Sequence, residues 1–305
     1  MFIDVHAHLN SEKFNDCVDD VVLNAKNNCV GKIICASSDY NSSKQSILLS
    51  KKYSNVYSCI GVHPEDCFCY NEEVENFFYD NKDNLKVVAI GEIGLDYYDL
   101  ETQIDYARKY YPNEKITEEI FIEKQKEVFV KQIELASRMG LPIVIHSRDA
   151  TKDTLDIVKA NASKITHGGL VHCFSGSSEI AKEYFKLGFY ISVGGVVTFK
   201  NSKNLPQVVK DVGIDRIMLE TDCPYLSPEP FRGKLNEPKN IPIIADKISD
   251  ILEIPTSEVE RITTNNAYKL FGRLKWLKIL NLIKNLVKTF CPTKICWTQL
   301  FLMPK

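Results

Sequence analysis

The sequence predicts an α/β fold, a (β/α)8 barrel of the TIM type, and three observations lead to this prediction. Short apolar and β-branched runs alternate eight times with longer segments in which apolar residues recur every three to four positions. The alternation occupies roughly 270 of the 305 residues, close to the roughly 250 typical of such barrels. Continuously apolar runs such as KVVAIGEIG and LPIVIHS fit parallel strands that are covered on both faces.

Eight strands are expected, each followed by a segment of helical period. They are residues 2–5, 31–36, 56–62, 86–91, 142–146, 168–173, 188–193 and 214–220. Residues 123–139 illustrate the helical spacing of apolar positions between strands. An open, doubly wound sheet is the alternative arrangement, but D-V-H-A-H stands at the first strand where a glycine-rich fingerprint would be needed.

Two segments do not fit the repeat. Residues 99–118 are polar and tyrosine-rich, and we expect them to form an insertion after strand four on the top face of the barrel. Residues 273–290 place apolar residues on one helical stripe and lysines on the other side. The chain therefore divides into a barrel, residues 1–272, and a basic amphipathic extension, residues 273–305. The extension is expected to dock on the barrel, with membrane or protein contact and disorder as alternatives.

Charge is unevenly distributed along the chain. Lysine and arginine number 38 and acidic residues 40, but residues 273–305 contain seven basic residues and no acidic one. The remaining 31 basic and 40 acidic residues give the first 272 a formal charge of −9. A body this acidic does not bind nucleic acid through a broad basic face, so nucleic-acid chemistry would need local cations such as bound metal ions.

The cysteines and the N-terminal segment predict an intracellular protein. The ten cysteines lack C-x-x-C spacing in a chain much longer than disulfide scaffolds, so we expect reduced thiols. The first ten residues have neither the basic nor the apolar region of a signal peptide, and no uncharged apolar run reaches 18 residues. A cytoplasmic location is expected, with the nucleus as an alternative.

Metal-binding side chains gather at one end of the expected barrel. Five of the six histidines lie at or just after the carboxyl end of a strand: His6, His8, His63, His146 and His172. Glu92 directly follows strand four and Asp222 follows strand eight, whereas His167 precedes its strand. Loops at the carboxyl ends build the active sites of such barrels. Histidine and carboxylate ligands suit divalent ions such as Zn, Mn or Mg.

The spacing of these residues predicts two ions. His6 and His8 lie two apart on an extended strand, so their rings point to one side and can share an ion with Glu92 and Asp222. Glu92 has two carboxylate oxygens and is the expected bridge to a second ion held by His146 and His172. Two ions would polarise a phosphoryl or carbonyl oxygen and activate water for hydrolysis. The alternative is that Glu92 and Asp222 serve only as helix caps or ion-pair partners.

The chain resembles the TatD family of metal-dependent deoxyribonucleases, which belongs to the amidohydrolase-like barrels. The motifs are FIDVHAHL, GVHP, GEIGLDY, LPIVIHSRDA, VHCFSG and LETDCPYL, in this order over residues 2–272. The resemblance implies a metallo-dependent hydrolase that cuts phosphodiester bonds in DNA, often with Mg and as an exonuclease. It supports the same six metal ligands. The chain departs from the family pattern at Glu65, Phe231 and Leu235, where the family often has two histidines and an arginine.

The remaining roles are hypotheses about single residues. Asp222 is expected to act as general base, and His63 to contact the scissile phosphate or the leaving oxygen, a core role being its alternative. Asp96 is expected to orient a ligand histidine, unless it caps a helix. Arg232 is expected to contact a phosphate, with a salt bridge to a neighbouring glutamate as the alternative. Nearby aromatic residues that could stack a nucleobase, with packing in the core as the commoner alternative, are Tyr97, Phe174 and Tyr225.

Three functions compete at this stage. The first is a deoxyribonuclease acting on DNA ends, in repair or DNA degradation. The second is hydrolysis of another ester, such as a misacylated tRNA or a small molecule, because the same centre activates water toward a carbonyl carbon. The third is a non-catalytic scaffold, which predicts loss of ligands, whereas every expected ligand is present.

Overall fold

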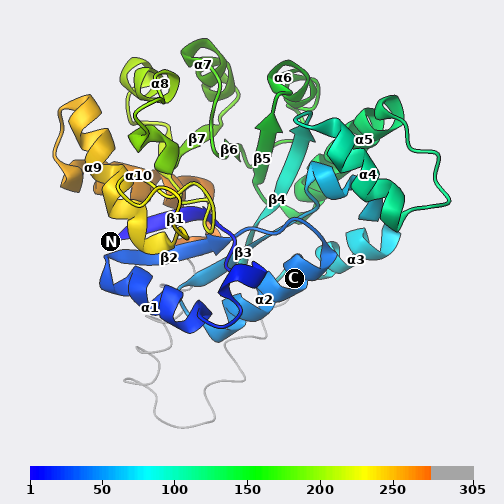
Figure 1. Cartoon of the computed structure of the whole chain (residues 1–305), viewed down its shortest axis with the longest axis horizontal. Coiled ribbons are helices and arrows are strands. Elements are labelled where there is room, and N and C mark those ends of the chain that lie inside the picture. Colours follow the sequence, from blue (N-terminus) through cyan, green and yellow to red (C-terminus); the bar gives the residue numbers. More distant parts are fainter. Residues whose placement is uncertain (276–305) are drawn as a thin grey trace, which may run out of the picture.

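The computed structural model describes residues 1–275 and is built around one sheet of eight parallel strands in sequence order. The strands are β1 Phe2–Ala7, β2 Val30–Cys35, β3 Val56–Ile60, β4 Val87–Asp96, β5 Ile143–Arg148, β6 Gly169–Val171, β7 Tyr190–Val193 and β8 Ile217–Leu219. Helices surround this sheet on its outer side (Figure 1). The predicted (β/α)8 barrel is therefore confirmed.

The helices follow the strands in the expected alternation. They are α1 Val18–Asn27, α2 Tyr40–Lys52, α3 Glu72–Asp80, α4 Leu100–Tyr110, α5 Glu118–Met139, α6 Thr151–Ala160, α7 Ser178–Lys186, α8 Asn204–Val212, α9 Ile241–Leu252 and α10 Thr256–Leu270. Short 3-10 helices are η1 Glu12–Phe14, η2 Pro64–Cys69, η3 Gly195–Thr198 and η4 Pro238–Asn240. No helix within residues 1–275 is long and apolar enough to cross a membrane.

The barrel closes between its last and first strands through a loop rather than a full ladder. β8 ends at Leu219, and one parallel bridge joins Ala7 to Cys223. Backbone bonds continue this contact, because Asp222 N donates to the His6 carbonyl at 2.9 Å and His8 N donates to the Cys223 carbonyl at 2.7 Å. The closure therefore brings Asp222 beside two histidines that precede it by more than 200 residues.

Two apolar clusters separate the inside of the barrel from its outside. Alternate strand residues such as Val5, Val88 and Val144 point inward and pack with Phe271 and Leu274, which follow α10. The residues between them face the helices and form the larger cluster. Because apolar side chains and α10 fill one end of the interior, the polar side chains occupy the other end, where the strands finish.

Strand four is longer than the sequence predicts. It continues to Asp96 and pairs with β5 as far as Asp96 opposite Arg148. The expected end at residue 91 was wrong, because β5 extends far enough to supply backbone partners to the longer β4. Glu92 therefore lies within a strand whose ten residues are all buried, and does not follow it in a loop.

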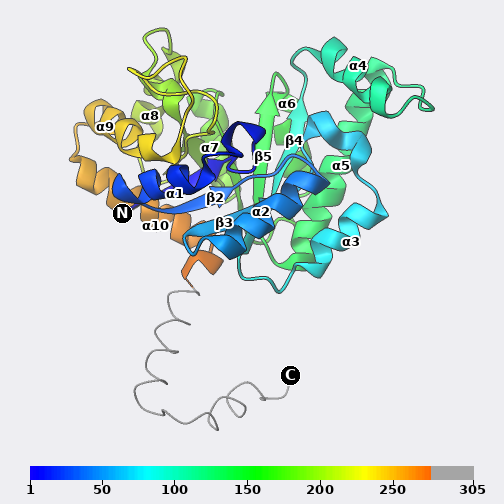
Figure 2. The same cartoon turned by 60° about the horizontal axis from the view of Figure 1, so that its bottom comes forward.

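The insertion at residues 99–118 contains helix α4 and a connecting loop. Arg108 on α4 ties the loop down, because its Nε and Nη2 donate to the Ile116 carbonyl at 3.1 and 2.7 Å. The arrows of β4 and β5 in Figure 2 point to the end of the barrel where α4 lies. The insertion thus borders the carboxyl ends of the strands, as predicted.

The amphipathic helix expected at residues 273–290 lies outside the described residues from position 276 onward. The three residues before that position continue the barrel's packing. Arg273 donates from Nη1 to the Val87 carbonyl at 2.7 Å, and Leu274 is fully buried. Contacts with the barrel therefore reach beyond residue 272, the predicted boundary.

Candidate metal centre

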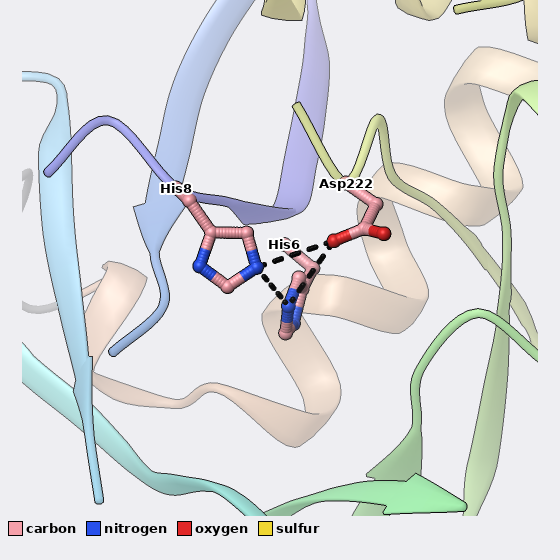
Figure 3. A group of neighbouring side chains, drawn as sticks. All are labelled: His6, His8 and Asp222. Carbon is pink, nitrogen blue, oxygen red and sulfur yellow. Dashed lines mark hydrogen bonds and ion pairs between the residues drawn. The ribbon is translucent and has the colours of Figure 1, made fainter. Parts of the chain in front are cut away.

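One cluster joins the end of β1 to the loop after β8. His6 Nε2 lies 3.3 Å from His8 Nε2, and Asp222 Oδ1 lies 3.7 Å from the former and 3.2 Å from the latter (Figure 3). Glu92 Oε2 completes this group at 3.2 Å from His6 Nε2 and 3.7 Å from His8 Nε2. The first predicted set of four ligands is thus brought together by three separate strand ends.

The other oxygen of Glu92 faces a second cluster. Oε1 lies 2.7 Å from His146 Nδ1 and 2.6 Å from His172 Nε2, and the two nitrogens are 3.1 Å apart. His146 comes from β5 and His172 directly follows β6. The ring of His172 also stacks on His6, with centroids 3.9 Å apart. Glu92 therefore stands between two groups of donors, one on each of its oxygens.

Burial and charge determine the protonation of these groups. Glu92 is only 4% exposed, and although burial alone would favour its neutral form, His172, His6 and His63 hold its pKa well below the usual range. Burial lowers the pKa of His6 to about 4. Burial also opposes the charged form of His146, but hydrogen bonds to Asp96 and Glu92 raise its pKa to about 10. The centre thus combines an ionised carboxylate with histidines of very different basicity.

Asp96 holds the far side of His146. The His146 Nε2 donates to Asp96 Oδ2 at 2.8 Å, so both ring nitrogens of His146 face carboxylates. The other Asp96 oxygen accepts bonds from Tyr98 N at 2.9 Å and Gln103 Nε2 at 3.1 Å. Asp96 does not cap α4, whose first residue is preceded by Asp99. The helix-cap alternative is therefore wrong for α4, and the orienting role stays a prediction.

His63 lies on the same rim, between the second cluster and the loop after β3. Its Nε2 is 3.5 Å from Glu92 Oε1, and its ring meets that of His146 edge-on at 4.3 Å. Its Nδ1 accepts the backbone N–H of Glu65 at 3.3 Å. The ring is therefore held from one side and presents Nε2 to the centre.

Glu220 is a residue that the sequence reasoning missed. It is fully buried and accepts bonds from Cys173 N at 2.6 Å and Ser192 Oγ at 2.5 Å, while its Oε2 lies 3.8 Å from His172 Nδ1. Burial, reinforced by the nearby Asp222, raises its pKa well above the usual value. The available signal was a carboxylate inside the apolar run IMLET at the end of strand eight. A glutamate side chain is rarely buried completely unless it is paired with other polar groups.

The donor set fits divalent ions. Histidine nitrogens and carboxylate oxygens that bind one ion at about 2.0–2.2 Å lie about 3–4 Å from each other. The donors of the first cluster are 3.2 to 3.7 Å apart, and those of the second are 2.6 to 3.1 Å apart. His172 Nδ1 is buried and has no hydrogen-bond partner, although its Nε2 points into the centre. A metal ion bound to Nε2 would leave the N–H on Nδ1, which could then donate a hydrogen bond to the neighbouring Glu220. The chemistry of these donors therefore fits divalent metal ions.

Arg232 and the predicted stacking residues lie in different environments. The Arg232 guanidinium is 4.4 Å from the centre of the Phe199 ring, and its Nη1 donates to Asn201 at 3.4 Å rather than pairing with a glutamate. Tyr225 is half exposed. Phe174 is buried and Tyr97 is partly buried, and both pack against the apolar core, which is the alternative to stacking. The Tyr97 hydroxyl also donates to Asp153 at 3.0 Å.

Comparison with known proteins agrees with this geometry. The family model described as TatD-related DNase matches residues 3–272. The chain is 41% identical to the uncharacterized metal-dependent hydrolase YabD of Bacillus subtilis, covering 89% of this chain and 99% of that protein. Among solved structures, the TatD homologue YjjV of Escherichia coli K12 aligns with a TM-score of 0.78 and 26% identity, covering 89% and 98% of the two chains. A TatD-family hydrolase of Entamoeba histolytica gives a TM-score of 0.71 and 27% identity, covering 88% and 97%.

Proposed function

Because the chain belongs to the TatD-related DNase family, we propose that it is a divalent-metal-dependent deoxyribonuclease that hydrolyses phosphodiester bonds from a DNA end. The observation that carries this proposal is the position of Glu92, whose two oxygens face two groups of histidine and carboxylate donors. Such a carboxylate suits a pair of ions, which is the arrangement used in many phosphodiester hydrolases.

The described side chains divide into two binding groups. His6, His8 and Asp222 with Glu92 Oε2 would hold one ion, and His146 and His172 with Glu92 Oε1 would hold the other. Bound ions of this kind polarise a phosphoryl oxygen and lower the pKa of bound water. Asp96 and Glu220 lie behind His146 and His172 and orient these rings.

Two further residues contact the reacting groups in the proposed mechanism. Asp222 faces the two histidines with Oδ1. Its other oxygen, Oδ2, would act as the general base that accepts a proton from the attacking water. His63 is held through Nδ1 and donates from Nε2 to the leaving oxygen. Both side chains are partly exposed, Asp222 by 15% and His63 by 12%, so a substrate can reach them.

Local cations on the rim offset the acidity of the barrel. Arg148 lies over the Tyr98 ring at 3.6 Å, Arg232 over the Phe199 ring at 4.4 Å, and the Lys13 ammonium over the Tyr225 ring at 4.7 Å. Arg148 is the last residue of β5, whereas Lys13 and Arg232 lie after β1 and β8, and all three cations lie over rings that are at least partly exposed. They can contact the backbone phosphates of a short DNA end without a continuous basic face.

The test is hydrolysis of end-labelled single-stranded and double-stranded DNA by metal-stripped protein supplied with Mg, Mn or Zn. Wild type is expected to remove nucleotides stepwise. Glu92→Ala is expected to lower kcat/KM at least about 100-fold, because it removes charge stabilisation of several kcal/mol. Asp250→Asn on the outer helix α9 is the matched control and should leave the rate unchanged.

A misacylated tRNA and a small carboxylic ester are assayed beside the DNA. Stepwise DNA loss that requires metal and disappears in Glu92→Ala supports the nuclease. Ester or tRNA hydrolysis without DNA cleavage under any of the three metals would refute the nuclease and leave an esterase or deacylase at the same centre.

A further inference from the structure

The most exposed aromatic rings of residues 1–275 all lie at the end of the barrel that carries the metal centre. They are Tyr98, Tyr106, Tyr110, Tyr225 and Phe231. Three belong to the segment after β4 and two to the loop after β8. A single exposed ring needs no explanation, but a group of rings around an active-site rim provides stacking surfaces for a ligand.

A cavity of about 440 Å³ separates α4 from η2 and the start of α2. Five aromatic side chains line it, and we call it the aromatic groove: Tyr40, Phe68, Tyr106, Tyr110 and Tyr111. The rings of Tyr106 and Tyr110 lie 4.7 Å apart, and both are more than half exposed. The volume falls within the range of about 300–1,000 Å³ that small-ligand sites occupy.

The inner wall of the aromatic groove is attached to His63. Glu65 lines the groove and donates its backbone N–H to His63 Nδ1 at 3.3 Å. The backbone N–H of His63 donates to the carbonyl of Ser38 at 2.7 Å. Ser38 directly precedes Asp39, which lines the groove. The wall of the groove is therefore tied by hydrogen bonds to a residue at the edge of the centre.

The charge of the aromatic groove excludes phosphate. Four carboxylates line it, on Asp39, Glu65, Asp66 and Glu73, and its described lining contains no lysine or arginine. Two ammonium groups lie by rings of the groove without belonging to its lining: Lys44 is 3.6 Å from the centre of the Tyr40 ring, and Lys109 is 5.7 Å from that of Tyr110. The other cations at this end of the barrel, Arg148, Arg232 and Lys13, belong to elements that do not line the groove. The phosphates of a DNA strand bound at the centre would thus lie near Arg148, Arg232 and Lys13. Only an uncharged part of the strand would enter the aromatic groove.

We propose that the aromatic groove binds the terminal nucleoside of a single-stranded DNA end, and that this terminal nucleoside must carry no phosphate. This inference rests on the proposed nuclease function and adds its end specificity. The base stacks on Tyr106 and Tyr110, and its ring N–H and amino groups donate to the groove carboxylates. A terminal phosphate would be placed among those carboxylates and is rejected by like charge.

The test compares oligonucleotides that differ only in a phosphate at the 5′ or the 3′ end. For the end that is degraded, wild type should give a KM about 5- to 100-fold lower for the hydroxyl form. Tyr110→Ala should raise the KM for the hydroxyl form by a similar factor, the loss expected for one base–aromatic contact. Leu48→Ala, an exposed apolar residue at the far part of α2, is the control and should change neither value.

A base-free diester, bis(p-nitrophenyl) phosphate, separates a binding role from a structural one. Tyr110→Ala should lower the ratio of kcat/KM on DNA to kcat/KM on this diester. Equal losses on both substrates, or equal KM values for phosphorylated and hydroxyl ends of wild type, would overturn the end specificity while leaving the nuclease intact. Absence of DNA cleavage by wild type would instead refute the nuclease itself.

Discussion

Asp66 places an unpaired carboxylate in the wall of the aromatic groove. Its carboxylate makes no hydrogen bond or salt bridge within the described part of the chain. Burial raises the pKa of this carboxyl from 3.8 to about 6; His63 opposes the rise, whereas Asp39 and Glu65 add to it. An acid whose pKa is higher in the folded state binds its proton more tightly there. The Asp66 carboxyl therefore does not lower the free energy of unfolding below pH 4. It lowers this free energy progressively between pH 4 and pH 6, and by its full amount above pH 6.

Asp66→Asn should therefore stabilise the protein at pH 8 and leave its stability at pH 4 unchanged. A shift of about two units corresponds to about 3 kcal/mol, and partial contact with water reduces the expected gain to about 1–2 kcal/mol. Urea unfolding of both proteins at the two pH values measures the difference. A gain of equal size at both pH values would contradict the assignment to this carboxyl.

Glu220 is predicted to orient His172 in the metal-loaded protein. Glu220→Gln keeps the shape of the side chain and an acceptor for Cys173 N, but its amide nitrogen cannot accept a proton from His172 Nδ1. Metal affinity is expected to fall about 10- to 100-fold, with thermal stability of the metal-free protein nearly unchanged. Isothermal titration of stripped protein with Mn or Zn provides both affinities, with Glu237→Gln as control. Wild-type affinity in Glu220→Gln would exclude the role.

At the scale of elements, α4 determines the outer wall of the aromatic groove. The helix contributes Tyr106 and Tyr110 and is connected to α5 by a loop that Arg108 ties down at Ile116. The Ile116 side chain is buried in the apolar core, so the bond from Arg108 holds the loop where this side chain packs. The position of the tyrosines thus depends on a guanidinium outside the groove lining.

Arg108→Leu should loosen residues 111–117 and weaken binding of DNA ends. Faster amide hydrogen exchange is expected in this loop, together with a rise in KM for DNA and an unchanged metal affinity, since the metal ligands lie on other elements. Lys115→Ala, an exposed change in the same loop, is the control. Unchanged exchange of the loop in Arg108→Leu would show that other contacts position α4.

At the scale of the whole molecule, the centre links distant parts of the chain. Its donors come from the ends of β1, β4, β5, β6 and β8, and Asp222 is held against His6 through the bond that closes the barrel. An ion that binds only this folded arrangement stabilises the entire barrel, because the unfolded chain separates the donors.

Saturating metal should raise the melting temperature of stripped wild type. At 100 times the dissociation constant the gain is about 2.7 kcal/mol, which corresponds to about 5 °C for a protein of this size. Glu92→Gln should show a much smaller rise, because the shared carboxylate is lost. Calorimetry over a metal titration measures the shift. An equal rise in both proteins would place the stabilising ion elsewhere.

The order of strands and the grouping of metal-binding residues could be predicted from the sequence. The apolar runs around Val5, Val88 and Val144 are local signals, and the rule that carboxyl ends of parallel strands share one edge brings the following histidines together. The end of β4 was missed because it depends on the length of β5, its partner in the sheet. The sequence leaves open whether Phe174 and Tyr97 stack on a ligand or pack inside, because sequence position does not reveal which side of a loop faces the core.

By itself the sequence determined the barrel, the end at which chemistry occurs and the donor types, because strand period and side-chain chemistry are local properties. Only the tertiary structure decided how Glu92 divides its oxygens between two clusters, that Glu220 lies behind His172, and that α4 builds the aromatic groove against η2. These relations join residues far apart in the chain, and their geometry depends on packing of the whole barrel, which no local pattern encodes.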